Sequence, residues 1–315
     1  MNVLSLFDGM SCGQLALKKA NISYDNYYAS EIDNHAITIA QKNFPKTIQV
    51  GNVVSLNKKN LPQIDLLIGG SPCQGFSMAG KQLNFEDERS KLFFEFVRLL
   101  NELKPKYFLL ENVKMKQEYR DVISSYLGVE CVEINSNLLS AQNRKRLYWT
   151  NIGNLNQPND KNIFLKNILQ KKVDLKKFLL KEESVIKQNI QKYRDERLVS
   201  QVVFTERRTE EAKRIRKEYR LKHGKDFSPR RAKEMVPRTD GKCNCLTTSL
   251  TKEHVLIDEE FKFRKLTPIE CERLQTVPDN YTSHINVSDT QRYKMLGNGW
   301  TISVIAHILK NIKNK

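Results

Sequence analysis

The stretch IDLLIGGSPCQGFS, residues 64–77, joins a short apolar run to a loop that contains glycine and proline. The run from Ile64 to Ile68 has the length and composition of a buried strand, and Pro72 and Cys73 follow it closely. Pro72 restricts the backbone before Cys73, and the neighbouring glycines permit a sharp turn. The stretch therefore predicts a core strand that ends in a loop presenting a thiol. The alternative is a small buried cysteine without a chemical role.

Outward from this strand, apolar runs alternate with amphipathic stretches over residues 2–113. Such alternation is typical of an α/β fold with a parallel sheet covered on both faces. Helical spacing in residues 90–104 predicts core positions at Leu92, Phe93, Phe96, Val97, Leu100 and Leu103. The apolar runs 129–139 and 146–153 follow each other without a helix between them. They predict that an antiparallel strand completes the sheet.

The alternation is lost beyond residue 152, where we expect a second, smaller domain to begin. A helix signal returns at TPIECERLQ, in which Thr267, Pro268 and Glu270 have the spacing of a capping box. The final stretch TISVIAHILKNI has apolar residues on one helical face. This last helix is expected to pack back on the first domain.

The charge of the chain is strongly positive and unevenly distributed. The 315 residues carry a formal net charge of +17, of which +11 falls within residues 171–242. A basic excess confined to one segment predicts a surface that binds nucleic-acid phosphates. The alternative is a solvated helix in which residues such as Glu210 and Arg214 pair with each other.

Bulk features exclude several classes of protein. No apolar run approaches the roughly 20 residues needed to cross a bilayer, and the first ten residues lack a basic signal region. We therefore expect a cytoplasmic protein. Six cysteines are too few for a disulfide scaffold, and only Cys243 and Cys245 stand close together. We expect no structural metal.

The segment FDGMSCG, residues 7–13, lies between the first predicted strand and helix, where open parallel sheets bind cofactors. Its glycines are spaced GxxxG, unlike the GxGxxG of dinucleotide-binding loops. Glu31 ends the second predicted strand, a position suited to binding ribose hydroxyls. Together with the acid at Asp8, these features favour a cofactor that carries adenosine and a positive charge. S-adenosylmethionine has both.

Three further side chains are expected near Cys73. Glu111, in the motif ENV, ends another strand of the same sheet, so its carboxylate should lie at the same edge. In QNRKR, Arg144 and Arg146 are two residues apart and would share one face of a strand. A thiol, a carboxylate and two arginines then converge. The alternative for the arginines is an exposed salt-bridging edge, and no histidine has a context that would favour a Cys/His hydrolase.

With these motifs in place, the chain resembles the DNA (cytosine-5)-methyltransferases. The motifs FDGMSCG, SEID, GGSPCQGFS, ENV, QNRKR, TPIECERLQ and LGNGW stand in that family's order. They are similar to those of bacterial and phage members, and their wording is also similar to that of the animal de novo DNA methyltransferases. The resemblance implies a Rossmann-like methyltransferase domain, residues 1–152 plus 286–315, and a basic target recognition domain, residues 153–285.

The resemblance also implies a reaction and the residues that perform it. A methyl group would pass from S-adenosylmethionine to C5 of a cytosine flipped out of a specific double-stranded DNA sequence. Cys73 would attack C6, Glu111 would hold N3 and the exocyclic amine, and Arg146, with Arg144 beside it, would bind O2. The implied cofactor-binding residues are Phe7, Asp8, Gly9, Cys12, Gly13, Glu31, Ile32, Asn52, Val53, Pro72, Leu92, Asn298 and Trp300. The expected DNA-binding residues are Ser77, Gln142, Arg207, Arg208, Arg214, Arg216, Thr247 and Thr248.

One residue departs from the family pattern, and two other functions stay open. Asn52 stands where the family usually has an aspartate that contacts the adenine amine. An RNA cytosine-5 methyltransferase shares the motifs, but it would not need the roughly 110 residues between Gly153 and Lys262. A catalytically silent DNA-binding regulator could share the fold, although intact Cys73 and Glu111 argue against it. The recognised DNA sequence, a cognate restriction endonuclease and the oligomeric state are left undetermined.

Overall fold

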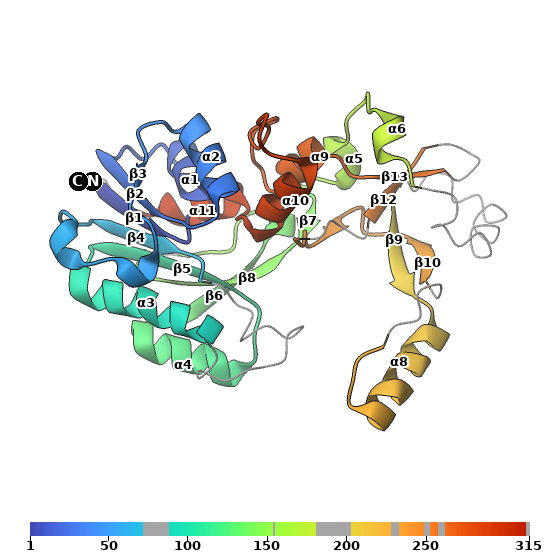
Figure 1. Ribbon diagram of the computed structural model, residues 1–315, viewed down its shortest axis with the longest axis horizontal. Coiled ribbons are helices and arrows are strands. Elements are labelled where there is room, and N and C mark those ends of the chain that lie inside the picture. Colours follow the sequence, from blue (N-terminus) through green and yellow to red (C-terminus); the bar gives the residue numbers. More distant parts are fainter. Residues whose placement is uncertain are drawn as a thin grey trace.

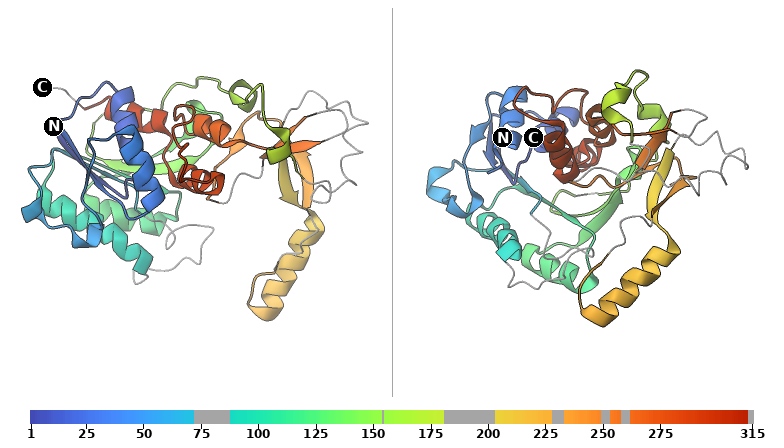
Figure 2. Two further views of the ribbon diagram at one scale, coloured as in Figure 1. Left: turned by 45° about the horizontal axis from the view of Figure 1, so that its top comes forward. Right: turned by 45° about the vertical axis from the view of Figure 1, so that its right-hand side comes forward.

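The computed structural model describes residues 1–71, 88–153, 155–180, 203–227, 233–248, 253–257 and 262–312. They form a large α/β body, at the left of Figure 1, and a smaller region that extends to its right. The first described strand and the last described helix both belong to the body (Figure 2). No helix of the described residues has the length and apolar character needed to span a bilayer.

The body is built on one seven-stranded sheet with the order β3-β2-β1-β4-β5-β8-β6. Its strands are β3 (Ile48–Gln49), β2 (Asn26–Ser30), β1 (Asn2–Leu6), β4 (Leu66–Gly69), β5 (Tyr107–Val113), β8 (Lys145–Thr150) and β6 (Cys131–Asn135). The first five pair in parallel, whereas β8 is antiparallel to both β5 and β6. The predicted α/β fold and its antiparallel completion are both confirmed.

Helices cover both faces of this sheet (Figure 1). One face is covered by α1 (Cys12–Lys19), α2 (Asn34–Asn43) and α11 (Ile302–Leu309), and the other by α3 (Glu88–Leu103) and α4 (Gln117–Leu127). Successive strand residues belong to two separate apolar clusters, Val3 and Ile68 to one and Leu4 and Leu67 to the other. The C-terminal helix packs against α1, as the sequence predicts.

The described residues of the smaller region, called the arm here, form a four-stranded antiparallel sheet and one long helix. The sheet has the order β10-β9-β12-β13. Its elements are β9 (Val203–Arg208), α8 (Glu210–His223), β10 (Lys233–Pro237), β12 (Glu253–Leu256) and β13 (Phe263–Lys265). The apolar core is small and contains Phe204, Met235 and Phe263. Helix α8 projects beyond the end of the small sheet (Figures 1 and 2).

The arm is attached to the body by short elements. Strand β11 (Cys243–Asn244) pairs in parallel with β7 (Gln142–Asn143). The other short helices of the described residues are α5 (Leu165–Ile168), α6 (Leu175–Phe178), α9 (Pro268–Leu274) and α10 (Asp289–Asn298). Three 3-10 turns, η1 (Val53–Ser55), η2 (Lys58–Asn60) and η3 (Ser136–Leu138), belong to the first half of the chain.

The predicted capping box at the start of α9 is confirmed. Glu270 N donates to Thr267 Oγ1 at 3.2 Å, and Thr267 N donates to Glu270 Oε2 at 2.8 Å. The same buried carboxylate receives two hydrogen bonds from Arg264 and one from the backbone N–H of Gln170. Glu270 therefore joins the chain that enters the arm to the chain that leaves it.

Candidate active site

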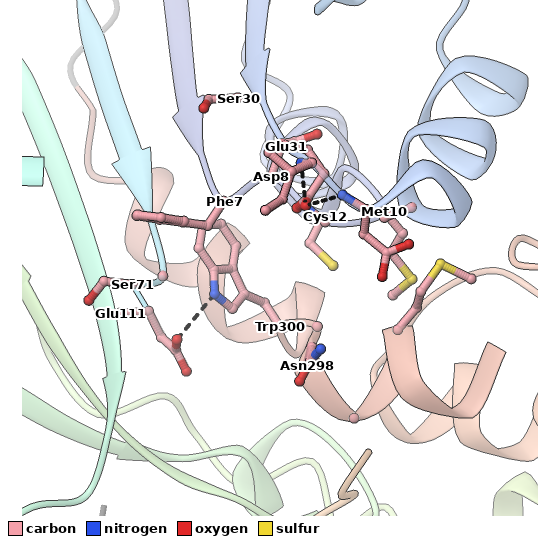
Figure 3. Close-up of a pocket in the computed structure, with 18 of the residues that line it drawn as sticks. Phe7, Asp8, Met10, Cys12, Ser30, Glu31, Ser71, Glu111, Asn298 and Trp300 are labelled. Carbon is pink, nitrogen blue, oxygen red and sulfur yellow. Dashed lines mark hydrogen bonds between the residues drawn. The ribbon is translucent and has the colours of Figure 1, made fainter. Parts of the chain in front are cut away.

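A cavity of about 470 Å³ lies at the carboxyl ends of β1, β2, β4 and β5 (Figure 3). Its walls come from the loops that follow these strands and from the segment 294–300. The size falls within the range of small-molecule and cofactor sites. Open parallel sheets bind ligands at this edge.

Glu31 ties together the loops that follow β1 and β2. Gly9 N donates to Oε2 at 2.7 Å, and the N–H groups of Ile32 and Asp33 donate to Oε1 at 2.7 and 2.9 Å. Gly9 has φ +59°, in the left-handed region that glycine adopts most easily. Oε1 already accepts two of these hydrogen bonds, whereas Oε2 accepts one and has a second lone pair that can accept a ribose hydroxyl.

The other glycine of the GxxxG spacing has a packing role. A Cβ at Gly13 would lie 2.3 Å from Tyr27 Oη and 2.5 Å from Ile68 Cδ1. No real side chain tolerates such distances, so glycine allows α1 to approach the sheet. Gly13 does not line the cavity.

Two ionisable groups of the first loop have strongly shifted pKa values. Burial, with a smaller contribution from the negative charge of Glu31, raises the pKa of Asp8 to about 6. The Tyr27 hydroxyl donates to Asp8 Oδ1 at 2.7 Å. Burial also raises the pKa of the Cys12 thiol to about 12. Cys12 is therefore protonated at neutral pH and poorly suited to be a nucleophile.

Glu111 stands at the end of β5 and is almost fully buried. Its Oε1 forms an ion pair with Arg146 Nε at 3.0 Å, and its Oε2 accepts a hydrogen bond from Trp300 Nε1 at 3.2 Å (Figure 3). Cys73 lies outside the described residues. Gly70 and Ser71, which lead to it, line the same cavity as Glu111.

The two arginines of QNRKR do not form an exposed edge. Arg146 belongs to β8, whereas Arg144 lies between β7 and β8 and is only 2% exposed. The guanidinium of Arg144 donates to the carbonyl groups of Leu246, Gly297 and Gly299. Arg144 therefore braces the segments around the cavity, and no ion pair to it occurs among the described residues.

Both arginines reach a residue that the sequence reasoning did not select. Arg144 Nη1 and Arg146 Nη2 lie 3.2 and 3.6 Å from Cys245 Sγ. Cys245 stands two residues before Thr247, which was selected. In an extended segment this spacing places the side chains of Cys245 and Thr247 on one face, and it could have identified Cys245.

Most of the predicted cofactor-binding residues line the cavity. They are Phe7, Asp8, Gly9, Cys12, Glu31, Ile32, Asn52, Val53, Leu92, Asn298 and Trp300. Pro72 lies outside the described residues. Lining residues that were not predicted include Met10, Ser30, Asp33, Lys294, Met295 and Gly299. Lys294 is one helical turn before Asn298, and this spacing could have identified it.

Asn52 has a local structural contact as well as a place in the cavity wall. Its Oδ1 accepts a hydrogen bond from Val54 N at 3.1 Å and caps η1. The side-chain carbonyl therefore already has one partner. Its side-chain NH2 group has no hydrogen bond among the described residues.

The residues predicted to bind DNA have different environments. Gln142 is fully buried, accepts from Leu246 N and donates to Leu274 O, so it joins the segment after β11 to the end of α9. The side chains of Thr247 and Thr248 are exposed. A Cβ at Gly297 would lie 2.4 Å from the Thr247 carbonyl, so α10 packs directly on this backbone. Ser77 lies outside the described residues.

The arm shows an extensive set of surface ion pairs. Arg214 pairs with Glu211 and Glu218, and Glu210 pairs with Lys213. These ion pairs form in place of the one considered between Glu210 and Arg214. Arg216 pairs with Asp226. Arg207 is exposed and Arg208 is partly exposed on β9.

Comparison with known proteins agrees with this geometry. The chain is 30% identical to Type II methyltransferase M1.ScrFI of Lactococcus lactis subsp. cremoris over 98% of this chain and 77% of the relative. It is 27% identical to Type II methyltransferase M.HhaI of Haemophilus parahaemolyticus over 99% of this chain and 94% of the relative. The S. pombe Dnmt2 methyltransferase structure has a TM-score of 0.66 at 18% identity over 98% of this chain and 97% of that one, which shows a shared fold.

A family model matches almost the entire chain. The model of the C-5 cytosine-specific DNA methylases matches residues 1–314, which include every strand and helix described above. The chain therefore belongs to the C-5 cytosine-specific DNA methylase family.

Proposed function

We propose that this DNA cytosine-5 methyltransferase uses S-adenosylmethionine as its methyl donor and acts on a cytosine flipped out of double-stranded DNA. The observation that carries the proposal is the position of Glu111. Its carboxylate is held by Arg146 and Trp300 in the same cavity as Glu31. A base-binding group and a ribose-binding group thus share one cavity.

The cavity suits the proposed cofactor. Glu31 would bind the ribose hydroxyls, and Ile32, which is 71% exposed, and Val53 offer apolar contacts for adenine. Asp8 has no ion pair among the described residues, and a positive charge in the cavity would stabilise its ionised form. S-adenosylmethionine supplies an electrophilic methyl group. The chain supplies its orientation and the activation of the base.

The base must be activated because C5 of cytosine is a weak nucleophile. In the proposed mechanism, the Cys73 thiolate adds to C6 and makes C5 enamine-like. Glu111 holds N3 and the exocyclic amine, and Arg146 stabilises the negative charge that develops at O2. After methyl transfer, loss of the C5 proton allows the thiolate to leave and restores the aromatic ring.

We further propose that the arm belongs to the target recognition domain, with the predicted bounds 153–285. The proposal is supported by the basic excess of residues 171–242 and by the attachment of β11 beside QNRKR. Phosphate contacts give affinity and position, whereas base contacts would provide the sequence preference. A cognate restriction endonuclease and the cytoplasm as location remain parts of the same proposal.

Bisulfite sequencing tests the function directly. Cells without cytosine methylation would express either the wild-type chain or Glu111→Gln, and their DNA would be sequenced after conversion. We expect protected cytosines within one recurring sequence for the wild type and very few for the variant. Complete conversion in both would contradict the proposed reaction. Equal protection in both would contradict the role of Glu111.

A further inference from the structure

Trp300, the second partner of Glu111, comes from a distant part of the chain. It is separated from Glu111 by 189 residues and stands in the turn between α10 and α11. Its indole lines the cavity while its N–H group points at Glu111 Oε2 (Figure 3). The same side chain therefore contacts the proposed cofactor site and the proposed base site.

The backbone around Trp300 is held from both sides. The carbonyl of Gly299 accepts from Arg144 Nη2 at 2.8 Å and from Gln275 Nε2 at 3.1 Å. The hydroxyl of Thr301 donates to Gln275 Oε1 at 2.8 Å. Trp300 itself is 9% exposed. These contacts limit the directions in which the indole N–H can point.

Gly70 brings the start of the Cys73 loop against this hydrogen bond. A Cβ at Gly70 would lie 2.9 Å from Trp300 Nε1 and 3.1 Å from Glu111 Oε2. A side chain at this position would push the indole or the carboxylate away. Glycine at position 70 therefore allows the backbone to pack directly against the hydrogen bond between Trp300 and Glu111.

A buried indole N–H needs a partner, and any acceptor would meet that need. The acceptor in this chain is the carboxylate proposed to hold the target base. The ion pair with Arg146 Nε is made by the other carboxylate oxygen, Oε1, at 3.0 Å. A second donor at Oε2 fixes the plane of the carboxylate before the base arrives, and such preorganisation lowers the cost of reaching the transition state.

We propose that Trp300 is a positioning residue for Glu111. Its indole N–H holds Oε2 in the orientation needed to contact N3 and the exocyclic amine of the flipped cytosine. The inference rests on the proposed function, because it takes Glu111 to be the group that binds the base.

A reaction that needs no cofactor separates this role from cofactor binding. Addition of the Cys73 thiolate forms a bond to C6, and C5 then takes a proton from water. Loss of the original C5 hydrogen and expulsion of the thiolate restore cytosine. If C5 carries tritium, the cycle releases tritium into water without methyl transfer. Glu111 acts in this cycle, whereas the cofactor does not.

The experiment replaces Trp300 with 3-benzothienylalanine, which has the shape of tryptophan but sulfur in place of the N–H group. Trp300→Phe provides a simpler second variant. The matched control places the same analogue at Trp149, whose indole N–H donates to Ser124 Oγ at 3.0 Å inside the body. Tritium release is measured without cofactor, and binding of S-adenosylhomocysteine is measured by calorimetry.

We expect tritium release to fall about tenfold or more with the analogue at position 300 and to change less than about twofold with the analogue at 149. Affinity for S-adenosylhomocysteine should change less than about twofold in both. Unchanged tritium release at position 300, or an equal loss at both positions, would overturn the proposal. Absence of release by the unsubstituted chain would contradict the proposed reaction and this role with it.

Discussion

The α/β body and the arm differ in how they are held together. The body has an apolar cluster on each face of a seven-stranded sheet. Among its described residues the arm has an apolar cluster of three buried side chains, and Ala212 is the buried residue of α8. Chemistry at one carbon atom requires side chains held by dense packing. Binding to the phosphate backbone of DNA depends more on the positive charge of the arm and on its extension from the body than on a large apolar core.

Ion pairs show the same contrast. The side chains of Glu111 and Arg146 are 11% and 15% exposed, whereas those of Glu211 and Arg214 are 58% and 64% exposed. Breaking a buried pair leaves an uncompensated charge, while an exposed pair contributes little and is screened by salt. Changes in the body should therefore alter the reaction, and changes in the arm should alter the salt dependence of binding.

The largest effect is expected for Cys73→Ser. A hydroxyl is a much weaker nucleophile than a thiolate, so methyl transfer should fall by about a thousandfold or more. DNA containing 5-fluorocytosine should be trapped covalently by the wild type in the presence of S-adenosylmethionine, because fluorine cannot leave as a cation. The variant should form no adduct but bind DNA normally. An adduct that persists in Cys73→Ser would disprove the assignment.

Glu111→Gln tests the body at a described residue. The amide can still accept from Trp300, but it carries no charge to pair with Arg146 or to stabilise a protonated N3. We expect kcat to fall by about a hundredfold to a thousandfold with DNA affinity nearly unchanged, measured by single-turnover kinetics and fluorescence anisotropy. Near-normal kcat would mean that another group holds the base.

Asp8→Asn tests the raised pKa of the buried carboxyl group in the segment FDGMSCG. Because the pKa of Asp8 is raised from 3.8 to about 6, the native state binds this proton more tightly than the unfolded chain does. The contribution of Asp8 to stability is therefore present at low pH and is lost as pH rises through 6. Between pH 5 and pH 8 the loss amounts to about 1.4 kcal/mol, roughly tenfold in the unfolding equilibrium.

An asparagine side chain does not titrate, so the Asp8→Asn variant should lack this part of the pH dependence. Urea unfolding of both chains without cofactor at the two pH values measures the difference. Parallel pH dependences would show that Asp8 is not protonated in the native state.

The arm should respond through salt. Arg207, Lys217 and Lys222 have no ion pair among the described residues, so their charges are available to phosphates. Changing all three to Glu should reduce the slope of log K against log salt by up to about 0.9 for each phosphate that is no longer neutralised. Arg214→Gln tests the expected DNA contact of Arg214 separately, and we expect a smaller change of slope because that side chain is already paired twice. Equal slopes in wild type and triple variant would identify α8 as a solvated surface.

The smallest effect is expected for Asn52→Asp. One carboxylate oxygen can keep the hydrogen bond from Val54 N, and the other becomes a charged acceptor for the adenine amine. Binding of S-adenosylhomocysteine should tighten by a few-fold in calorimetric titration. Weaker binding would show that the Asn52 amide donates to the cofactor. DNA binding should not change, because the substitution lies in the body.

Local patterns predicted much of this molecule. The alternation of apolar runs indicated the α/β sheet, and the spacing of Thr267, Pro268 and Glu270 indicated the start of α9. The position of Glu111 at the carboxyl end of a strand predicted that it lies at the edge of the sheet where the cavity is found. These predictions succeed because they depend on neighbours in sequence or on the common edge of a parallel sheet.

Contacts between distant segments could not be predicted. The sequence predicted Arg144 beside Arg146 at the base-binding centre, but three carbonyl groups from segments more than 100 residues away enclose its guanidinium. The partner of Trp300 depends on how α11 returns to the sheet. Arg214 pairs with Glu211, three residues before it, and not with Glu210, four residues before it. Both spacings place side chains within reach on a helix, so the sequence alone does not distinguish them. Tertiary packing decides each of the long-range contacts.

The hydrogen bonds of Glu270 have an evolutionary consequence. The chain leaves for the arm after Gln170 and is back at Thr267, and one buried carboxylate binds the backbone N–H groups of both. Because these two points meet, residues between them can be gained or lost without separating the strands of the body. If the intervening segment recognises the target, as proposed above, descendants of this gene could acquire new target sequences by exchanging it, while the residues that line the cavity are inherited unchanged.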